Sequence, residues 1–312
     1  MATRIATAKT TPSSPRVLFI SSYSPYAVGG VSQFMIDLGA RFLSRGGIVG
    51  FCYRQEPREI DLPDWVSGAI DVEIGLRPPP PVGTPLFLLR TMVHLFRSRS
   101  NFDVFHVIVP QPMTAVATLV GRILGKPVVA TTFAPYRRTD RRTSGLFQRI
   151  SERIVQAGVD ANVYECEATQ RAFADPKGIV VYSGVNPDFY APEPATRERI
   201  RRELKIPDEA VVFLYAGRVT TSKGTRDLLS AFDALLSPLR DRAVLIIVGP
   251  YEEDFSDWTS SPAVREGRIR FLGSTGKEGI RDLYRLADVF VLPSYQEGIS
   301  SSLLESMACG LP

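Results

Sequence analysis

The chain has 312 residues, of which 44% are hydrophobic and 22% charged, and its formal net charge at pH 7 is +4. This length suffices for two domains with full cores. No apolar run approaches the roughly 20 residues that span a bilayer, which excludes a membrane-spanning helix. The cysteines Cys52, Cys166 and Cys309 lie far apart without metal-ligand spacing, so we expect reduced, packed thiols and a cytoplasmic protein.

The first residues are basic and rich in Thr and Ser, but they lack the apolar segment of a secretory signal. We expect residues 1–15 to be a disordered tail, with a transit peptide as the alternative.

Short apolar runs typical of β-strands recur along the chain, and helical patterns lie between many of them. Several runs are apolar throughout, such as VLIIV at 244–248, which predicts parallel strands covered by helices on both faces of a sheet. The runs cover residues 17–21, 48–53, 70–74, 103–109, 127–131, 161–164, 178–182, 211–216, 244–248, 269–272 and 288–292.

A break at about 183–210 combines turn residues, prolines and a charged helix-like stretch, and a fresh strand begins at Val211. We therefore predict an α/β fold with two Rossmann-like domains. Their expected bounds are 16–190 for the first domain, 191–210 for a linker and 211–312 for the second domain. The proline run 78–81 is expected to be a loop within the first domain.

Basic residues outnumber acidic ones in the first domain, and two interpretations remain open. The excess is either a solvated loop and helix face or a surface that meets an anionic membrane or acceptor. Residues 85–100 are basic and apolar, and we favour a helix packed in the core over an amphipathic helix at a membrane. The arginine cluster comprises Arg137, Arg138, Arg141, Arg142, Arg149 and Arg153.

Two strand-to-helix turns carry residues suited to phosphate. Gly29 and Gly30 follow the strand 17–21, where backbone N–H groups at a helix start could approach an anion, although a plain tight turn is the simpler interpretation. After the strand 211–216, Arg218 and Lys223 flank a turn, and Lys223 precedes a helix whose dipole disfavours a cation. An anion between them would explain this placement, and two exposed basic residues at a turn are the alternative.

Two carboxylates stand at the end of the chain. Glu297 lies in a loop after the strand 288–292, and Glu305 lies in the following helix-like segment. Ligands of open α/β sheets bind at the carboxyl ends of strands. Glu305 also fits a capping box with Ser302, in which it would only reach back to the Ser302 backbone.

Together these elements resemble the retaining glycosyltransferases of family 4, which have the GT-B fold. The resemblance covers nearly the whole chain, and its motifs agree in order and spacing. They are SPYAVGGVSQFMIDLGARFLSRGG, FDVFHV at 102–107, SGVNPDFYAP at 183–192, GRVTTSKG at 217–224, LIIVGP at 245–250, RIRFLGSTGKEGIRDLYRLADVFVLPS at 268–294 and EGISSSLLESMACGLP at 297–312.

The resemblance implies two domains facing across a cleft, with a nucleotide-sugar donor on the second domain and an acceptor on the first. The acceptor would be a glycan, a lipid-linked molecule or a small molecule. No metal, no cofactor beyond the donor and no nucleic acid partner are implied, and contact with a membrane would be peripheral, at the cytoplasmic face. Transfer would retain the anomeric configuration by same-face attack.

The same resemblance assigns a role to each matching residue. Arg218 and Lys223 would neutralise the donor diphosphate, Glu305 would bind the ribose, and Glu297 would be the carboxylate beside the donor sugar. Backbone N–H groups of Gly298, Ile299 and Ser300 would bind sugar or phosphate, and Gly29 with Gly30 would close over the leaving group.

Three departures from the family pattern stand out. Ile108 replaces a second His after His106, and we expect His106 to be a packed core residue. Phe133 replaces a His near the donor sugar. The sequence stops at Pro312, where relatives continue, so we expect the second domain to be incomplete.

Two other functions compete with an active transferase. One is a non-catalytic fragment or nucleotide-sugar binding module, and the other is a nicotinamide-dependent dehydrogenase. The dehydrogenase is disfavoured because neither strand 17–21 nor strand 211–216 is followed by GxGxxG.

Overall fold

The computed structural model describes residues 15–26, 29–54, 66, 70–74, 83–133, 145–235 and 242–312. The chain divides into two compact units, Met1–Tyr182 and Ser183–Pro312, and each is described by itself.

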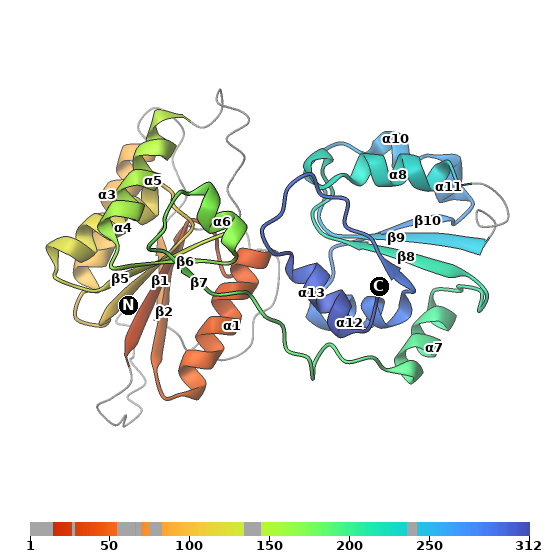
Figure 1. Cartoon of the computed structure of the whole chain (residues 1–312), viewed down its shortest axis with the longest axis horizontal. Helices are drawn as coiled ribbons and strands as arrows, with labels where there is room; N and C mark the ends of the chain where they lie inside the picture. The colour runs from red at the N-terminus through yellow and green to blue at the C-terminus, as the bar shows by residue number, and fades with distance from the viewer. Residues whose placement is uncertain are drawn as a thin grey trace. The chain divides into compact units, whose positions relative to one another are not determined.

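The described strands of the first unit form one parallel sheet (Figure 1). Its order is β3-β2-β1-β4-β5-β6-β7, so the chain reverses its direction of growth between β1 and β4. All neighbouring pairs are parallel. The strands are β1 (Arg16–Ser21), β2 (Ile48–Arg54), β3 (Ile70–Ile74), β4 (Val104–Ile108), β5 (Val128–Thr132), β6 (Ala161–Tyr164) and β7 (Ile179–Val180).

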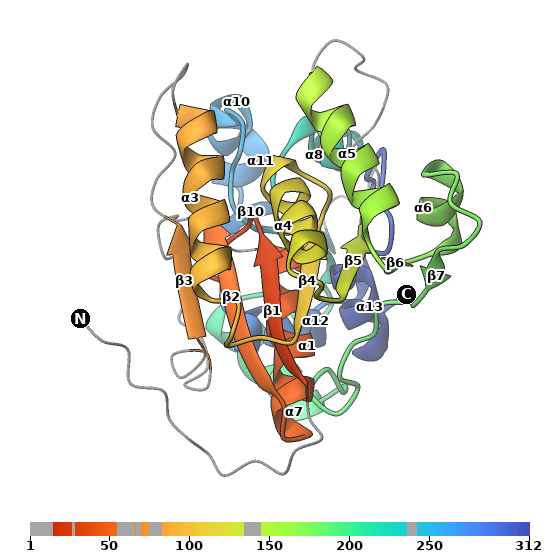
Figure 2. The same cartoon turned by 90° about the vertical axis from the view of Figure 1, so that its left-hand side faces the viewer.

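Helices cover both faces of this sheet. Figure 2 shows α3, α4 and α5 side by side over one face, with α1 on the other. Alternate residues of a strand point to opposite faces, and accordingly Leu18 lies in the core beneath α3–α5 while Phe19 packs on the α1 side. The helices are α1 (Gly30–Ser44), α3 (Gly83–Arg97), α4 (Pro112–Ile123), α5 (Leu146–Gly158) and α6 (Glu167–Ala172).

The second unit repeats this layered design around a smaller parallel sheet of order β10-β9-β8-β11. Its strands are β8 (Val211–Ala216), β9 (Ala243–Val248), β10 (Ile269–Gly273) and β11 (Val289–Phe290). Its helices are α7 (Pro194–Glu203), the 3-10 turn η1 (Thr221–Lys223), α8 (Thr225–Asp233), α10 (Ser256–Thr259), α11 (Pro262–Arg265), α12 (Lys277–Leu286) and α13 (Ser301–Ala308).

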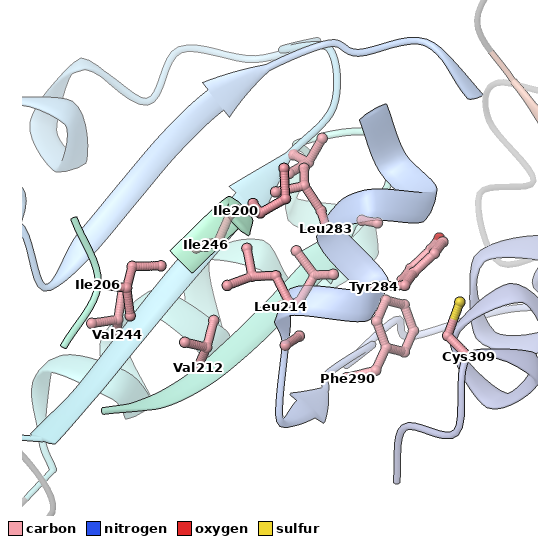
Figure 3. Close-up of a cluster of buried hydrophobic side chains, with 14 of the residues drawn as sticks. Ile200, Ile206, Val212, Leu214, Val244, Ile246, Leu283, Tyr284, Phe290 and Cys309 are labelled. Atoms are coloured by element: carbon pink, nitrogen blue, oxygen red, sulfur yellow. The ribbon is translucent and has the colours of Figure 1, made fainter. Parts of the chain in front are cut away.

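Two cores lie on the two faces of the second sheet. On one face, Leu214 and Ile246 of the sheet meet Ile200 of α7 and Leu283 of α12 (Figure 3). On the other face, the neighbouring residue Tyr215 belongs to a core with Leu229 and Phe232 of α8. Both faces are therefore covered, which confirms the predicted α/β class with parallel sheets.

The boundary between the units corrects the predicted linker. The division falls after Tyr182 rather than after residue 190, and residues 191–210 belong to the second unit. Helix α7 lies within this range, and Arg197 fixes it by donating to the carbonyls of Leu286 and Ala287 and to the carboxylate of Asp288. The same carboxylate accepts from the backbone N–H of Val212, so α7 is held against the first strand of the second sheet.

Several other predictions can be placed on the described residues. Cys52, Cys166 and Cys309 are free and buried, as predicted. Core packing of the segment 85–100 is also confirmed, because Phe87 and Leu95 of α3 are buried. Residues 1–14, the proline run 78–81 and the arginines between 137 and 142 lie outside the described residues. Within the described ranges, no helix is both long and apolar enough to cross a membrane.

Candidate functional site

The second sheet has a switch point at its carboxyl edge. Strand β8 lies between β9 and β11, so the loops that leave β8 and β11 diverge to opposite sides. Open parallel sheets bind ligands in the crevice outside such a pair of strands. The predicted donor residues 217–224 follow β8, and those at 297–300 follow β11.

Lys223 and Glu297 form an ion pair across this switch point. Lys223 Nζ lies 2.6 Å from Glu297 Oε1, although the two residues are 74 positions apart in the sequence. Both side chains are partly exposed, with 19% and 28% of their surface accessible to solvent. Ser294 Oγ donates to the same carboxylate oxygen over 2.8 Å. The sequence placed these residues in one site, and the structure adds that they are direct partners.

A close approach of two backbones brings this pair together. Gly224 has φ of 68°, and a Cβ built on it would lie 2.1 Å from the carbonyl oxygen of Pro293. In addition, the backbone N–H of Tyr295 donates to the Ser222 carbonyl, and its hydroxyl donates to Asp227 over 2.7 Å. The loop after β11 is therefore tied directly onto the turn that carries Lys223.

Lys223 stands at the positive end of a helix, as predicted. It ends the 3-10 turn η1, and Gly224 follows as the N-cap of α8, which begins at Thr225. Thr220 caps this turn, since its side chain accepts from the backbone N–H of Lys223. A cation is unfavourable at this end of a helix. The carboxylate of Glu297 provides the opposing charge.

Arg218 follows β8, and both its side chain and its backbone carbonyl have partners. Its guanidinium lies 2.7 Å from Glu252 Oε2, and both side chains are well exposed. Its carbonyl accepts a hydrogen bond of 2.6 Å from the hydroxyl of buried Tyr215. A ligand that bound the Arg218 guanidinium would therefore have to displace Glu252 from it. Breaking this ion pair would cost little free energy, because ion pairs between solvent-exposed side chains are weak.

The alternative interpretation of Glu305, a capping box with Ser302, is wrong. Helix α13 begins at Ser301, and Ser300 caps it by accepting from the backbone N–H of Leu303. Glu305 consequently lies beyond the first turn. Its two carboxylate oxygens accept from two tyrosines, Tyr190 over 2.8 Å and Tyr284 over 3.0 Å.

These two tyrosines are site residues that the sequence did not reveal. Both side chains are buried, and burial, followed by the charge of Glu305, raises the pKa of Tyr284 above its usual range. A buried Tyr hydroxyl needs a partner, and Glu305 provides one for each ring. Each carboxylate oxygen still has capacity to accept from a ligand hydroxyl. Both tyrosines lie in motifs of the sequence, but an aromatic residue in an apolar run is indistinguishable from ordinary core.

Gly298, Ile299 and Ser300 lead directly into α13. The first turn of this helix carries no acidic residue. The first backbone N–H groups of a helix have no intrahelical partner, and they attract anions. The location therefore suits the predicted backbone contacts to sugar or phosphate, which stay a prediction.

In the first unit, Gly29 and Gly30 mark the start of α1, beyond the carboxyl end of β1. Gly29 has φ of 162°, an extended conformation that any residue adopts, and a Cβ on it would meet nothing within 4 Å. Neither backbone geometry nor packing among the described residues therefore requires glycine at 29. An approaching ligand would provide a reason for the missing side chain.

Three positions of the first unit, His106, Ile108 and Phe133, match places where many relatives carry histidine. His106 is buried against Phe19, and its Nε2 lies 2.8 Å from Thr131 Oγ1. Burial lowers the pKa of His106 to about 4, so it is a neutral core residue at pH 7, as predicted. Phe133 packs edge-on against Phe34 of α1, with ring centroids 5.0 Å apart. Over the described ranges, no group of His, Cys, Asp and Glu side chains is arranged to hold a metal ion.

Comparison with known proteins follows the same division of the chain. Residues 28–189 match the model of "Glycosyltransferase Family 4", and residues 196–312 match that of "Glycosyl transferases group 1". The first of these models covers half of the chain.

Curated relatives match over shorter segments. A D-inositol 3-phosphate glycosyltransferase of Corynebacterium efficiens is 37% identical over 147 residues, which are 45% of this chain and 35% of the relative. An O-antigen chain mannosyltransferase B of Escherichia coli is 39% identical over 101 residues, 32% of this chain and 26% of the relative. The matches thus span about a third or less of the length of these relatives.

Among solved structures, HepE of Anabaena in complex with UDP-glucose is similar over most of the chain. The TM-score is 0.73 at 18% identity, and the match covers 96% of this chain and 79% of HepE. At this identity the likeness concerns the fold, which is that of the GT-B glycosyltransferases.

Proposed function

We propose, because this chain belongs to glycosyltransferase family 4, that it transfers a sugar from a nucleoside-diphosphate sugar to an acceptor in the cytoplasm. The transfer would retain the anomeric configuration and need no metal. The acceptor would be a glycan, a lipid-linked molecule or a small molecule. A nucleotide-sugar donor is supported by the structural similarity to a protein that binds UDP-glucose.

The observation that carries this proposal is the ion pair of Lys223 and Glu297 at the switch point of the second sheet. A bound diphosphate would take Lys223 Nζ as a charge-assisted donor. Glu297 would then lose its partner and turn to the hydroxyls of the donor sugar. The pair neutralises both charges, and one ligand would use both of them.

The reaction would need little acid–base chemistry from the protein. The bond between the anomeric carbon and the diphosphate oxygen breaks, and the acceptor oxygen attacks on the same face. The acceptor's proton passes to the leaving phosphate oxygen. Lys223 and Arg218 would stabilise the negative charge that develops on the leaving group, the kind of electrostatic stabilisation that lowers many enzymatic barriers.

Thermal unfolding with UDP-, GDP- and ADP-sugars tests the donor directly. A specific donor at about 100 times its dissociation constant should stabilise the folded chain by about 2.7 kcal/mol and raise its melting temperature. Assays for donor hydrolysis and transfer should accompany the screen. Stabilisation without turnover would favour the binding module over the enzyme, and no stabilisation by any donor would contradict both.

Replacing Tyr190 with Phe tests the proposed ribose role of Glu305. The variant loses one of the two hydroxyls that orient the carboxylate, so we expect nucleoside-diphosphate affinity to fall about three- to tenfold by calorimetry. Tyr182→Phe is the matched control, since Tyr182 is exposed. A nucleotide without ribose hydroxyls should bind both variants equally well. An equal loss with that nucleotide would mean that Tyr190 affects only folding or packing.

A further inference from the structure

The loop that carries Glu297 has no regular structure of its own. Residues 291–300 connect β11 to α13 and form neither a helix nor a strand. Residues 293–300 of this connection are the Glu297 loop. A side chain in such a segment keeps its position only through contacts with neighbouring elements. The position of Glu297, the proposed carboxylate beside the donor sugar, therefore depends on the contacts that hold this loop.

Tyr295 ties the Glu297 loop to helix α8. Its side chain gains little from burial, since Tyr295 is 66% exposed. Its hydroxyl nevertheless donates to Asp227 Oδ2 over 2.7 Å, and this bond raises the pKa of Tyr295 above its ordinary value. The backbone N–H of Tyr295 donates over 3.3 Å to the carbonyl of Ser222. Hydrogen bonds to a charged acceptor are the stronger kind, so the hydroxyl contact fixes this exposed side chain on α8.

Asp227 is a firm anchor for this contact. It lies in the first turn of α8, where the helix dipole favours a negative charge. The next two residues, Leu228 and Leu229, are buried in the core on this face of the second sheet, so the helix cannot shift without disturbing that core. Asp227 follows Lys223 by four positions. The hydroxyl of Tyr295 thus attaches the Glu297 loop to the same short segment that carries Lys223.

The ion pair and the Tyr295 hydrogen bond are two separate cross-links between the same segments. Lys223 Nζ contacts Glu297 Oε1 over 2.6 Å. Ser294 also donates to Glu297, but it belongs to the same loop, so this contact does not hold the loop in place. A diphosphate that took Lys223 would break the ion pair. The Tyr295 bond does not involve Lys223, so it would persist and keep Glu297 in place beside the sugar.

We propose that Tyr295 is a positioning residue for Glu297. Its hydroxyl, through Asp227, holds the Glu297 loop on α8 while a ligand occupies Lys223, and it needs no contact with the substrate. This inference rests on the proposed transferase function and adds to it a residue that acts through Glu297. A misplacement of about 1 Å can cost a factor of about 100 in rate, so one exposed hydrogen bond can matter to turnover.

Hydrogen exchange measured by mass spectrometry tests this contact without any ligand. Lys223→Ala removes the ion pair as a bound diphosphate would, and Tyr295→Phe removes only the hydroxyl. We expect Tyr295→Phe to speed exchange of the Glu297 loop about threefold in the parent chain and at least about threefold in the Lys223→Ala background, since each opening of the loop must break this bond. Exchange in β8 and β9 should be unchanged, because their hydrogen bonds are not altered.

Steady-state kinetics measure the consequence for Glu297. With the donor that the thermal screen identifies, Tyr295→Phe should lower kcat about three- to tenfold and leave nucleoside-diphosphate affinity unchanged, because the proposed diphosphate ligands are intact. Asp227→Ala should lower kcat equally. The double variant should be no worse than either single variant, since both changes remove the same hydrogen bond. Tyr251→Phe is the matched control, because Tyr251 is 43% exposed beyond β9 and its hydroxyl makes no hydrogen bond within the described part of the chain.

Two results would overturn the inference. One is loop exchange that Tyr295→Phe leaves unchanged in both backgrounds, which would show that the hydroxyl does not hold the loop. The other is a fall in kcat that Asp227→Ala does not share, which would mean that Tyr295 contacts the substrate directly. If no donor binds, the proposed function fails, whereas the exchange experiment still decides whether Tyr295 holds the Glu297 loop on α8.

Discussion

Replacing Glu297 with Gln is expected to lower turnover by roughly 100- to 1,000-fold, the usual effect of removing one electrostatic contact to a transition state. Nucleoside-diphosphate affinity should be unchanged or slightly tighter. The reason is the ion pair of Glu297 with Lys223, which would compete with a bound diphosphate for the same ammonium group. Gln keeps the shape of the side chain but removes the charge. Steady-state kinetics and calorimetry on one preparation measure the two effects.

Lys223→Ala provides the contrast to that experiment. It removes the proposed diphosphate ligand, so affinity should fall by roughly 1.5–3 kcal/mol, as for a lost hydrogen bond to a charged group. Lys177→Ala, an exposed lysine of the first unit, is the control. If Glu297→Gln lost affinity and turnover together, Glu297 would be a nucleotide ligand and its proposed role beside the sugar would be wrong.

Strands were predictable where both faces of a sheet are buried. Such strands are continuous apolar runs, and β9 shows this clearly, since each of its residues is buried. The run 178–182 predicts a longer strand than the structure contains. Only Ile179 and Val180 pair with β6, at the edge of the first sheet, while Val181 and Tyr182 remain exposed. An apolar run indicates a strand, but it does not show how many of its residues form hydrogen bonds with an adjacent strand.

The sequence predicts a helix-like stretch at α7 but assigns it to the linker, for a different reason. Its sequence PATRERIRRE is strongly charged, which is typical of a solvated linker. The helix is held instead by Arg197 and Arg201, which both reach Asp288. Arg201 is itself buried. A contact between charges about 90 positions apart leaves no periodic signal in a sequence, so only the tertiary structure assigns α7 to the second unit.

The candidate site shows the same limit. Lys223 and Glu297 could be nominated from their motifs, yet their pairing depends on how two loops meet. The false capping box arose because Ser300, Ser301 and Ser302 are consecutive and each can cap a helix. The structure selects Ser300, which leaves Glu305 to Tyr190 and Tyr284.

Replacing Gly224 with Ala should separate the two loops that form the site. Its φ of 68° is strained for any residue with a Cβ, and that Cβ would lie 2.1 Å from the Pro293 carbonyl oxygen. Strain of about 1–2 kcal/mol adds to an overpacking cost of about 1–3 kcal/mol. We therefore expect urea unfolding to show a loss of roughly 2–5 kcal/mol in the free energy of unfolding.

Gly267→Ala is the control that separates the cost of the steric clash with Pro293 from the cost of the strained backbone conformation. Gly267 has φ of 76°, but a Cβ there would meet nothing within 4 Å, so only the strain of about 1–2 kcal/mol should appear. Donor affinity should fall in Gly224→Ala, because relief of the clash moves the Pro293–Glu297 loop away from Lys223, and it should stay unchanged in Gly267→Ala. Equal stability losses and equal affinities in the two variants would show that the loops do not approach as closely as the ion pair of Lys223 and Glu297 requires.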